Sequence, residues 1–129
     1  PTPDYVLDER YMGWAEQNVA ESGGSLRVSH DIESAYRGAD VVYAKSWGAL
    51  PFFGNWEPEK PIRDQYKHFI VDEAKMALTN NGVFSHCLPL RRNVKATDGV
   101  MDSPQCIAID EAENRLHVQK AIMAALMQQ

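Results

Sequence analysis

The chain has 129 residues, 24% of them charged, and a net charge of −5 with both signs spread along its length. A chain of this length fits one domain and can bury roughly two-thirds of its unfolded surface, so a hydrophobic core is expected. The charge pattern lacks the basic stripe of a nucleic-acid-binding protein, and no apolar run reaches the roughly 20 residues of a membrane span. We therefore expect neither nucleic acid nor a membrane as a partner.

The cysteines of the chain are Cys87 and Cys106. Two thiols make no disulfide framework, and they lack the paired spacing of a zinc site, so we expect no metal and a reducing, cytoplasmic location. The chain opens with Pro1-Thr2-Pro3-Asp4, without an initiator Met and without a signal peptide. From this opening we expect a piece of a longer protein.

The first third of the chain predicts two helices and two strands. Asp4 and Asp31 are placed to cap the helices, because short acidic side chains accept hydrogen bonds from the first free N–H groups of a helix. In chain order we expect a helix from near Tyr5 to a stop at Gly23-Gly24, a strand over 26–28, a brief helix over 32–37 and a buried strand over 41–44.

The long segment 45–61 contains Gly48, Pro51, Gly54, Pro58 and Pro61, and this number of helix and strand breakers predicts an irregular loop. A loop of this length inside a compact domain is usually functional. The elements expected after it are a helical turn over 64–67, a helix over 73–78 capped by Asp72, a strand over 82–84, a helical turn capped by Thr97 and ending at Met101, a strand over 106–109, and a last helix over 111–127 with a wide apolar face.

Strands alternate with helices along the chain, which favours an α/β fold with four short parallel strands and right-handed crossovers. The strand over 82–84 runs into His86-Cys87-Leu88-Pro89, and Pro89 ends it because proline has no N–H to donate. Open parallel sheets bind their ligands at the carboxyl ends of their strands. The turn therefore presents a thiol and free carbonyl groups where a ligand site is expected.

Two motifs, Ser85-His86-Cys87-Leu88-Pro89 and Glu111-Ala112-Glu113-Asn114-Arg115, occur in the order found in the transcarbamylases. The chain resembles the second-substrate domain of that family. The resemblance implies a Rossmann-like parallel sheet with helices on both faces, and one α/β domain over 1–129 that lacks its first strand and helix. It also implies a homotrimer without a cofactor. The family's first domain, with its Ser-x-Arg-Thr phosphate loop, has no counterpart in this chain, so the chain alone is expected to be inactive.

Cys87 is open to three interpretations from the residues alone: a nucleophile, a positioning group or an ordinary buried thiol. Arg115 follows two acidic residues in a first helical turn, so it is either a solvated helix arginine or a bidentate ligand of an oxyanion. In the family, the matching Cys-Leu pair contacts the carbamoyl group and the matching arginine contacts carbamoyl phosphate. The resemblance therefore assigns Cys87, Leu88 and Arg115 to catalysis and carbamoyl phosphate binding.

Lys45 follows the strand over 41–44 and is by itself either a surface lysine or part of the ligand crevice. The ornithine enzymes of the family have an aspartate here, followed by a Ser-Met-Gly loop that binds the free α-amino group. A lysine would repel that ammonium by about 1 kcal/mol even in water. An N-acylated ornithine removes the conflict, so the resemblance places Lys45 and Arg91 on the side of N-acetyl-L-ornithine.

Lys95 ends the extension Leu90-Arg91-Arg92-Asn93-Val94-Lys95 and is either a solvated loop lysine or, as the resemblance implies, carboxylated on its ε-nitrogen. A carboxylated lysine is an anion and could hold Arg91 or Arg92. We expect His86 to be a structurally satisfied strand histidine. Asp98 and Asp102 are expected to be helix-terminus residues.

The reaction that the resemblance implies is carbamoyl transfer from carbamoyl phosphate to the δ-amine of N-acetyl-L-ornithine, giving N-acetyl-L-citrulline and phosphate, in arginine biosynthesis. The alternatives are an enzyme acting on ornithine or N-succinylornithine, and a non-catalytic α/β module that binds an anion. The second class is disfavoured because the chain has no Gly-rich nucleotide or phosphate loop.

Overall fold

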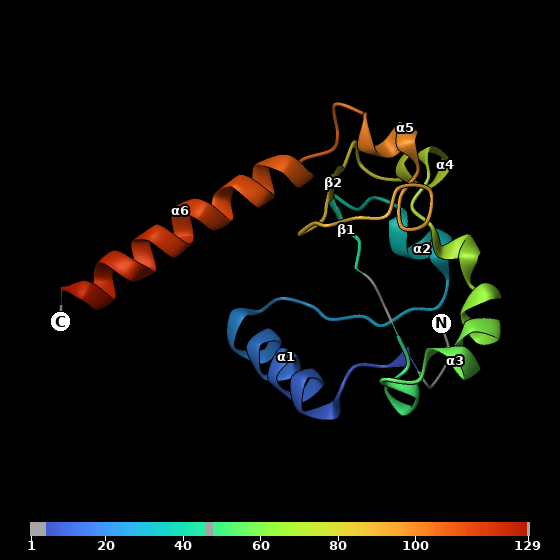
Figure 1. The fold of residues 1–129 in the computed structure, drawn as a ribbon, viewed down its shortest axis with the longest axis horizontal. Helices are drawn as coiled ribbons and strands as arrows, with labels where there is room; N and C mark the ends of the chain where they lie inside the picture. Colours follow the sequence, from blue (N-terminus) through green and yellow to red (C-terminus); the bar gives the residue numbers. More distant parts are fainter. Residues whose placement is uncertain (1–4, 46–47, 129) are drawn as a thin grey trace. The chain divides into compact units, whose positions relative to one another are not determined.

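The structure, a computed structural model, describes residues 5–45 and 48–128 (Figure 1). These residues belong to two compact units. The first is drawn from Pro1–Ala35 and Trp47–His68, and the second from Tyr36–Ser46 and Phe69–Gln129. Each unit is built from segments that are separate in sequence, and the second contains the parallel strands.

In the first unit, helix α1 spans Glu9–Ser22. Its N-cap is Asp8, whose carboxylate accepts from the N–H of Arg10 at 2.9 Å, so the helix begins four residues later than expected. Asp4, the expected cap, lies outside the described residues. The expected stop is confirmed, since Gly23 has a φ of 71° and donates to the Val19 carbonyl, a conformation that costs glycine little.

The strand expected over 26–28 is absent, because no neighbouring segment among the described residues pairs with it. A strand depends on a partner for its hydrogen bonds, which a local pattern cannot supply. Helix α2 spans Ile32–Tyr36, and its first turn is capped by Asp31, which accepts from the Ser34 N–H at 3.2 Å. Gly38 follows with a φ of 73°, so the brief helix and its stop are confirmed.

The segment 45–61 is not the irregular loop that its prolines and glycines predict. It contains a 3₁₀ turn over Leu50–Phe52 and helix α3 over Trp56–Asp64. Pro58 lies in the first turn of α3, where the N–H groups have no helical acceptor and none is lost. Pro61 lies inside the helix, where it removes one backbone hydrogen bond. A second 3₁₀ turn, over Lys67–Phe69, replaces the helical turn expected at 64–67.

The second unit is built on two parallel strands, β1 over Val41–Tyr43 and β2 over Val83–Ser85. Their register pairs Val41 with Val83 and Tyr43 with Ser85. Gly82 allows the strands to approach, because a Cβ at this position would lie 2.6 Å from the Ala39 carbonyl oxygen. The parallel α/β arrangement is thus confirmed, although two strands are found in the described residues where four were expected.

The expected strand over 106–109 is wrong in extent. Cys106 forms a single parallel bridge with Phe84. In this bridge the Ile107 N–H donates to the Phe84 carbonyl at 2.9 Å. Helix α6 then spans Ala108–Met127 and takes the last two of those residues. The sheet thus continues past β2 by one bridge only.

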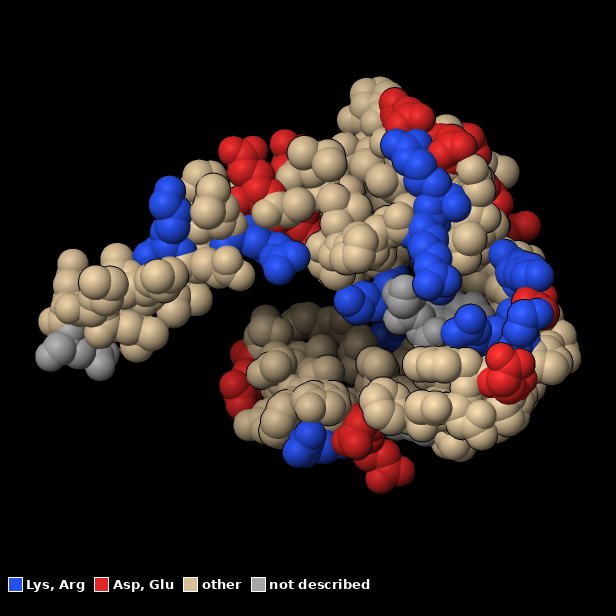
Figure 2. All heavy atoms as spheres, viewed as in Figure 1, with Lys and Arg blue, Asp and Glu red and all other residues tan. Residues whose placement is uncertain are grey.

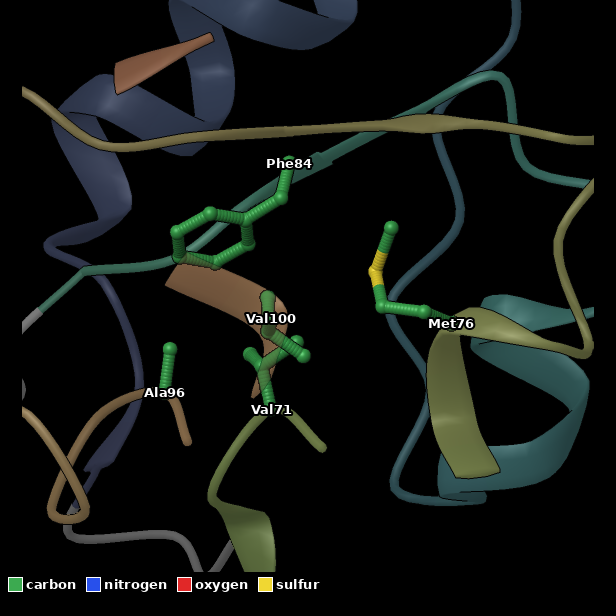
Figure 3. Packing of buried hydrophobic residues seen from close by; sticks show 5 residues of the cluster. All are labelled: Val71, Met76, Phe84, Ala96 and Val100. Atoms are coloured by element: carbon green, nitrogen blue, oxygen red, sulfur yellow. The ribbon is translucent and has the colours of Figure 1, made fainter. Parts of the chain in front are cut away.

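Two short helices are capped as expected. Asp72 accepts from the Lys75 N–H at 2.9 Å at the start of α4, Glu73–Met76. Thr97 accepts from the Val100 N–H at 3.3 Å at the start of α5, Asp98–Met101. Both helices contribute to the core of the second unit, which consists of Val71, Met76, Phe84, Ala96 and Val100 (Figure 3). Phe84, the middle residue of β2, is fully buried in this core.

Helix α6 is packed only at its beginning, where Ala108 is fully buried. Its apolar side chains farther along are more than half exposed: Leu116, Val118, Ile122, Met123 and Leu126. Residues after Lys120 include no charged side chain, and the far part of the helix is tan in Figure 2. The wide apolar face that the sequence predicts is therefore present, and the residues that the structure describes leave it exposed.

Candidate functional site

The carboxyl ends of β1 and β2 lie side by side, because Tyr43 and Ser85 are the last pair of their register. Two residues farther along each strand, the Lys45 ammonium approaches the Cys87 thiol, with 3.3 Å between Nζ and Sγ. These residues are 42 positions apart in sequence. The structure thus brings Lys45 and Cys87 together at one edge of the sheet.

The first turn of α6 is tied to both strand ends through one carboxylate. Glu111 accepts from the Tyr43 hydroxyl at 3.2 Å through one oxygen. Its other oxygen accepts a short hydrogen bond from the Ser85 hydroxyl. A single acidic side chain thus joins the sheet edge to the helix that carries Arg115. Acidic residues also suit the positive N-terminal end of a helix dipole.

Cys87 is partly exposed and lies among polar neighbours. Hydrogen bonding to Tyr43, then to Lys45, holds the pKa of the Cys87 thiol below its ordinary value, against a smaller opposing effect of burial and of the Glu111 charge. Hydrogen bonding to Cys87, followed by burial and Glu111, raises the pKa of Tyr43 to about 12. The phenol therefore keeps its proton at neutral pH, while the thiol is more readily ionised than a free cysteine.

His86 is 3% exposed, and its Nδ1 accepts from the Leu88 N–H at 2.9 Å. Leu88 has a left-handed φ of 48°, and its peptide bond to Pro89 is cis. The Nε2 atom is buried without a hydrogen-bond partner among the described residues. The expectation of a fully satisfied histidine is therefore wrong at one of its two nitrogens.

Burial, followed by the charge of Lys45, lowers the pKa of His86, and Lys95 acts in the same direction. The imidazole is therefore neutral at physiological pH. Since Nδ1 accepts a hydrogen bond, the proton of the neutral ring lies on the buried Nε2. This unpaired donor points to a group that would accept from it, a feature that the position of a histidine in a strand could not reveal.

The two arginines in the extension over 90–95, which follows the turn, have different contacts. Arg92 binds Asp98 at 2.9 Å and Asp102 at 2.6 Å, and these two hydrogen-bonded carboxylates raise the pKa of its guanidinium. Asp98 opens α5 and Asp102 is its C-cap, so both are helix-terminus residues as expected. Arg91 is exposed, and its carbonyl accepts from the Lys95 N–H at 3.0 Å. Of the two arginines in this extension, Arg91 is therefore the one without a carboxylate contact among the described residues.

Arg115 is exposed and forms no hydrogen bond or ion pair within the part of the chain that the structure describes. It follows Glu111 by four residues, and residues four apart lie on one face of a helix, about 5–6 Å between their Cβ atoms. Because Glu111 contacts both strand ends, Arg115 lies one helical turn beyond the same edge of the sheet. The structure thus brings Lys45 and Cys87 into contact and places Arg115 on the adjoining helix face.

Three residues of this network were not expected to act in the site: Tyr43, Ser85 and Glu111. A signal for Tyr43 is its position two residues before Lys45, since alternate residues of a strand share a face. The described residues hold no cluster of His, Cys, Asp or Glu that could bind a metal ion. None of the described helices is both long enough and apolar enough to span a membrane.

Comparison with known proteins agrees with the motifs. The family model "Aspartate/ornithine carbamoyltransferase, Asp/Orn binding domain" matches residues 1–126. The chain is 91% identical over all 129 residues to the N-acetylornithine carbamoyltransferase of Xanthomonas campestris pv. campestris, and 81% identical to that of Xylella fastidiosa strain 9a5c. It is 40% identical over 131 residues to the ornithine carbamoyltransferase of Thermococcus kodakarensis, with 98% of the chain and 40% of that protein covered.

The chain spans 38% of the length of the Xanthomonas and Xylella relatives. Among solved structures, it resembles acetylornithine transcarbamylase complexed with acetylcitrulline, with a TM-score of 0.93 and 92% identity over 98% of this chain and 38% of that one. The parallel strands, the Cys87 turn and the start of α6 thus have counterparts in proteins of known fold. The chain belongs to the aspartate/ornithine carbamoyltransferase family and matches its Asp/Orn-binding domain.

Proposed function

We propose that this chain is the second-substrate domain of an enzyme that transfers the carbamoyl group of carbamoyl phosphate to the δ-amine of N-acetyl-L-ornithine, in arginine biosynthesis. The observation that carries the proposal is the Lys45 ammonium 3.3 Å from the Cys87 thiol, at the shared end of two parallel strands. The names of the close relatives support the same reaction. The assignment of residues 1–129 to one domain, without its first strand and helix, remains a prediction.

Lys45 supports an acylated second substrate because of its charge. A free α-ammonium beside it would be repelled by about 1 kcal/mol at contact range in water, and by more in a desolvated site. The α-nitrogen of N-acetylornithine carries no charge, so Lys45 can face the α-carboxylate, with Arg91 as a second cation. N-Succinylornithine would satisfy Lys45 equally, and the identity of the close relatives favours the acetyl group.

The reaction forms a C–N bond between the δ-amine and the carbamoyl carbon, breaks the C–O bond to phosphate, and removes one proton from the amine. In this proposal the carbonyls of Cys87 and Leu88, which the turn leaves free of the strand ladder, accept from the carbamoyl amide. Arg115 binds the phosphate oxygens and stabilises the charge that develops on them. Catalysis then consists of positioning and charge stabilisation, without a cofactor.

Lys95 is proposed to be carboxylated on its ε-nitrogen. The buried Nε2–H of His86 lacks an acceptor among the described residues, and Lys95 lies close enough to lower the pKa of that histidine. A carboxylated Lys95 would be an anion able to accept from His86 and to face Arg91, whereas Arg92 is already bound by two aspartates. Intact-protein mass spectrometry under carbon dioxide should show the added mass of one carbon dioxide, which Lys95→Arg should abolish.

The remaining parts of the site are proposed to come from a first domain and from a neighbouring subunit of a homotrimer. The chain spans 38% of its close relatives, so a complete active site needs residues that these 129 positions do not supply. We also propose a cytoplasmic location, where the partly exposed Cys87 would stay reduced.

The experiment uses a chimeric enzyme, in which this chain replaces the 129 matching residues of the Xanthomonas campestris relative. kcat/KM is measured for N-acetylornithine, N-succinylornithine and ornithine. We expect N-acetylornithine to be preferred, and Lys45→Gln to raise its KM about tenfold, as expected for loss of one charged contact. Lys60→Gln, which changes an exposed lysine of α3, is the matched control. A preference for free ornithine would contradict the proposal.

A further inference from the structure

We propose that Asn93 is a positioning residue: its side-chain amide binds Asp98 and thereby fixes the turn over 91–96. This turn carries Arg91 and Lys95, so the inference rests on the proposed function, which assigns a role to each of them. Asn93 acts through these two neighbours and does not itself touch a substrate.

The backbone of the turn over 91–96 folds back on itself. The Lys95 N–H donates to the Arg91 carbonyl at 3.0 Å. The Lys95 carbonyl accepts from the Val71 N–H at 2.9 Å, which ties this end of the turn to the core of the second unit. Arg91 and Lys95 are thus joined by a hydrogen bond, and their relative placement depends on the conformation of the residues between them.

Asn93 lies where this turn reverses. Its φ is 58°, in the left-handed region that asparagine and glycine adopt more readily than other residues. Its N–H donates to the Ala96 carbonyl at 2.7 Å. The reversal therefore requires a residue that tolerates a positive φ at this position.

Both polar atoms of the Asn93 side chain bind the same residue. Its Oδ1 accepts from the Asp98 N–H at 3.0 Å, and its Nδ2 donates to the Asp98 carboxylate at 2.7 Å. We call these two hydrogen bonds the Asn93–Asp98 clasp. Hydrogen bonds from Asn93, then from Arg92, hold the pKa of the Asp98 carboxyl below its ordinary value. Asp98 is therefore ionised at neutral pH.

The clasp specifies the turn more closely than the neighbouring ion pair can. Arg92 and Asp98 are each about half exposed, and exposed ion pairs contribute little because water screens them. The clasp is directional, since each of its two bonds needs a donor on one residue and an acceptor on the other. It also joins the turn to α5, whose Val100 is buried in the core. The turn is therefore fixed to the second unit at two points, Lys95 and Asn93.

The test exchanges the two members of the clasp in the chimeric enzyme. Asn93→Asp alone sets two carboxylates against each other, because Asp98 is ionised. The double variant Asn93→Asp with Asp98→Asn makes residue 98 the side-chain donor and residue 93 the acceptor. The amide oxygen of residue 98 can still accept from Arg92 there. The matched control is Asn80→Asp, since Asn80 donates to Asp40 at 2.9 Å in an exposed pair before β1 and β2.

Each variant is assayed for kcat and for the KM of both substrates. We expect Asn93→Asp to raise KM for N-acetylornithine about tenfold, as for the loss of one charged contact. KM for carbamoyl phosphate should change by less than about twofold, because the residues proposed to bind it lie outside the turn. The double variant should return KM for N-acetylornithine to within about threefold of the parent, and Asn80→Asp should match the parent.

Amide hydrogen exchange at Lys95, followed by mass spectrometry, gives a second readout that does not depend on activity. Exchange should be faster in Asn93→Asp, because the hydrogen bond to the Arg91 carbonyl opens more often, and slower again in the double variant. Thermal melting checks that each variant is folded. If Asn93→Asp does not fold, Asn93→Gly replaces it, since glycine adopts the left-handed φ and lacks only the amide. The same changes are expected of it.

A KM for N-acetylornithine within twofold of the parent, in a folded enzyme without the clasp, overturns the inference. A double variant that is no better than Asn93→Asp alone also overturns it, because the loss would then not come from the clasp. The proposed function fails separately, if the parent chimera transfers no carbamoyl group to N-acetylornithine. Exchange at Lys95 then decides: faster exchange that the double variant reverses supports the clasp, and unchanged exchange overturns it.

Discussion

The segments that follow β1 and β2 are stabilised in different ways. After β2, the chain from His86 to Ala96 is fixed by residues distant in sequence: the Val71 N–H donates to the Lys95 carbonyl at 2.9 Å, and Ala96 is fully buried in the core. After β1, the part of the chain from Gly48 to Asp64 belongs to the first unit and contains a local contact of its own. There the Ala49 N–H donates at 2.8 Å to the carboxylate of Glu59, which lies ten residues later in the sequence and is fully buried.

The two segments therefore differ in how far a sequence change in them would affect the rest of the fold. The turn after β2 carries Cys87, which is proposed to act in carbamoyl phosphate binding, and the position of this turn depends on the core of the second unit. The segment after β1 lacks the Ser-Met-Gly sequence that the resemblance assigns to the ornithine enzymes, and it belongs to the first unit. A segment outside the core of the second unit can change without disturbing the sheet, which fits the proposal that the residues after β1 distinguish second substrates.

The largest expected effect on stability is that of Phe84→Ala, which removes the central side chain of β2 (Figure 3). Deleting a fully buried phenylalanine costs about 3–5 kcal/mol of unfolding free energy, because the core loses its contacts and keeps a cavity. Phe53→Ala, in the segment after β1, is the control, since Phe53 is 84% exposed. It should change the unfolding free energy by less than about 0.5 kcal/mol.

Urea unfolding of the two chimeric variants measures both values. Similar losses for Phe53→Ala and Phe84→Ala would show that the segment after β1 contributes as much to stability as the core of the second unit. The comparison between the two segments would then be wrong.

The next effect is on activity, through the helix joined to the strand ends. Arg115→Ala should lower kcat/KM for carbamoyl phosphate roughly tenfold to a few hundredfold, since a hydrogen bond to a charged group contributes about 1.5–3 kcal/mol. Lys120→Ala, an exposed residue farther along α6, is the control and should leave the value unchanged. If kcat/KM of a folded Arg115→Ala enzyme fell by less than twofold, Arg115 would be a solvated helix residue without a role in binding carbamoyl phosphate.

Glu59→Ala tests whether the segment after β1 is independent of the core of the second unit. The change leaves the Ala49 N–H without its acceptor, and a buried unsatisfied N–H costs about 1–3 kcal/mol. Amide hydrogen exchange should accelerate around Ala49 and stay unchanged at Phe84. Glu57→Ala, at an exposed position of the same helix, should change neither. Faster exchange at Phe84 in the Glu59 variant would show that the segment and the core of the second unit are coupled.

The smallest effect is the pH dependence contributed by Asp72, at the start of α4. Burial raises the pKa of this carboxyl, but hydrogen bonds from the Lys75 side chain and backbone outweigh it, so the pKa lies below the ordinary 3.8. The folded-state pKa is depressed, so its stabilisation is present above that ordinary value and is lost as the pH falls through the folded pKa. Urea midpoints should fall more steeply in acid for the parent than for Asp72→Asn, and parallel curves would contradict this.

Local chemistry determined much of the fold. The caps formed by Asp31, Asp72 and Thr97, and the stop at Gly23, follow from side chains that bond within a few residues. The motifs that contain Cys87 and Arg115 were also sufficient to identify the family, because chemistry at a strand end and at a helix start is written in contiguous residues. Such features can be predicted because their partners are neighbours along the chain.

The tertiary structure decided what depends on distant partners. Residues 26–28 and 106–109 have the composition of strands, but a strand also needs a neighbour to share its hydrogen bonds. Helix α3 forms despite Pro58 and Pro61. Its buried Glu59 accepts a hydrogen bond from the Ala49 N–H, a contact that no periodicity in the sequence predicts. The contacts of Glu111 with Tyr43 and Ser85 bridge 68 and 26 residues, so only folding could bring these side chains together.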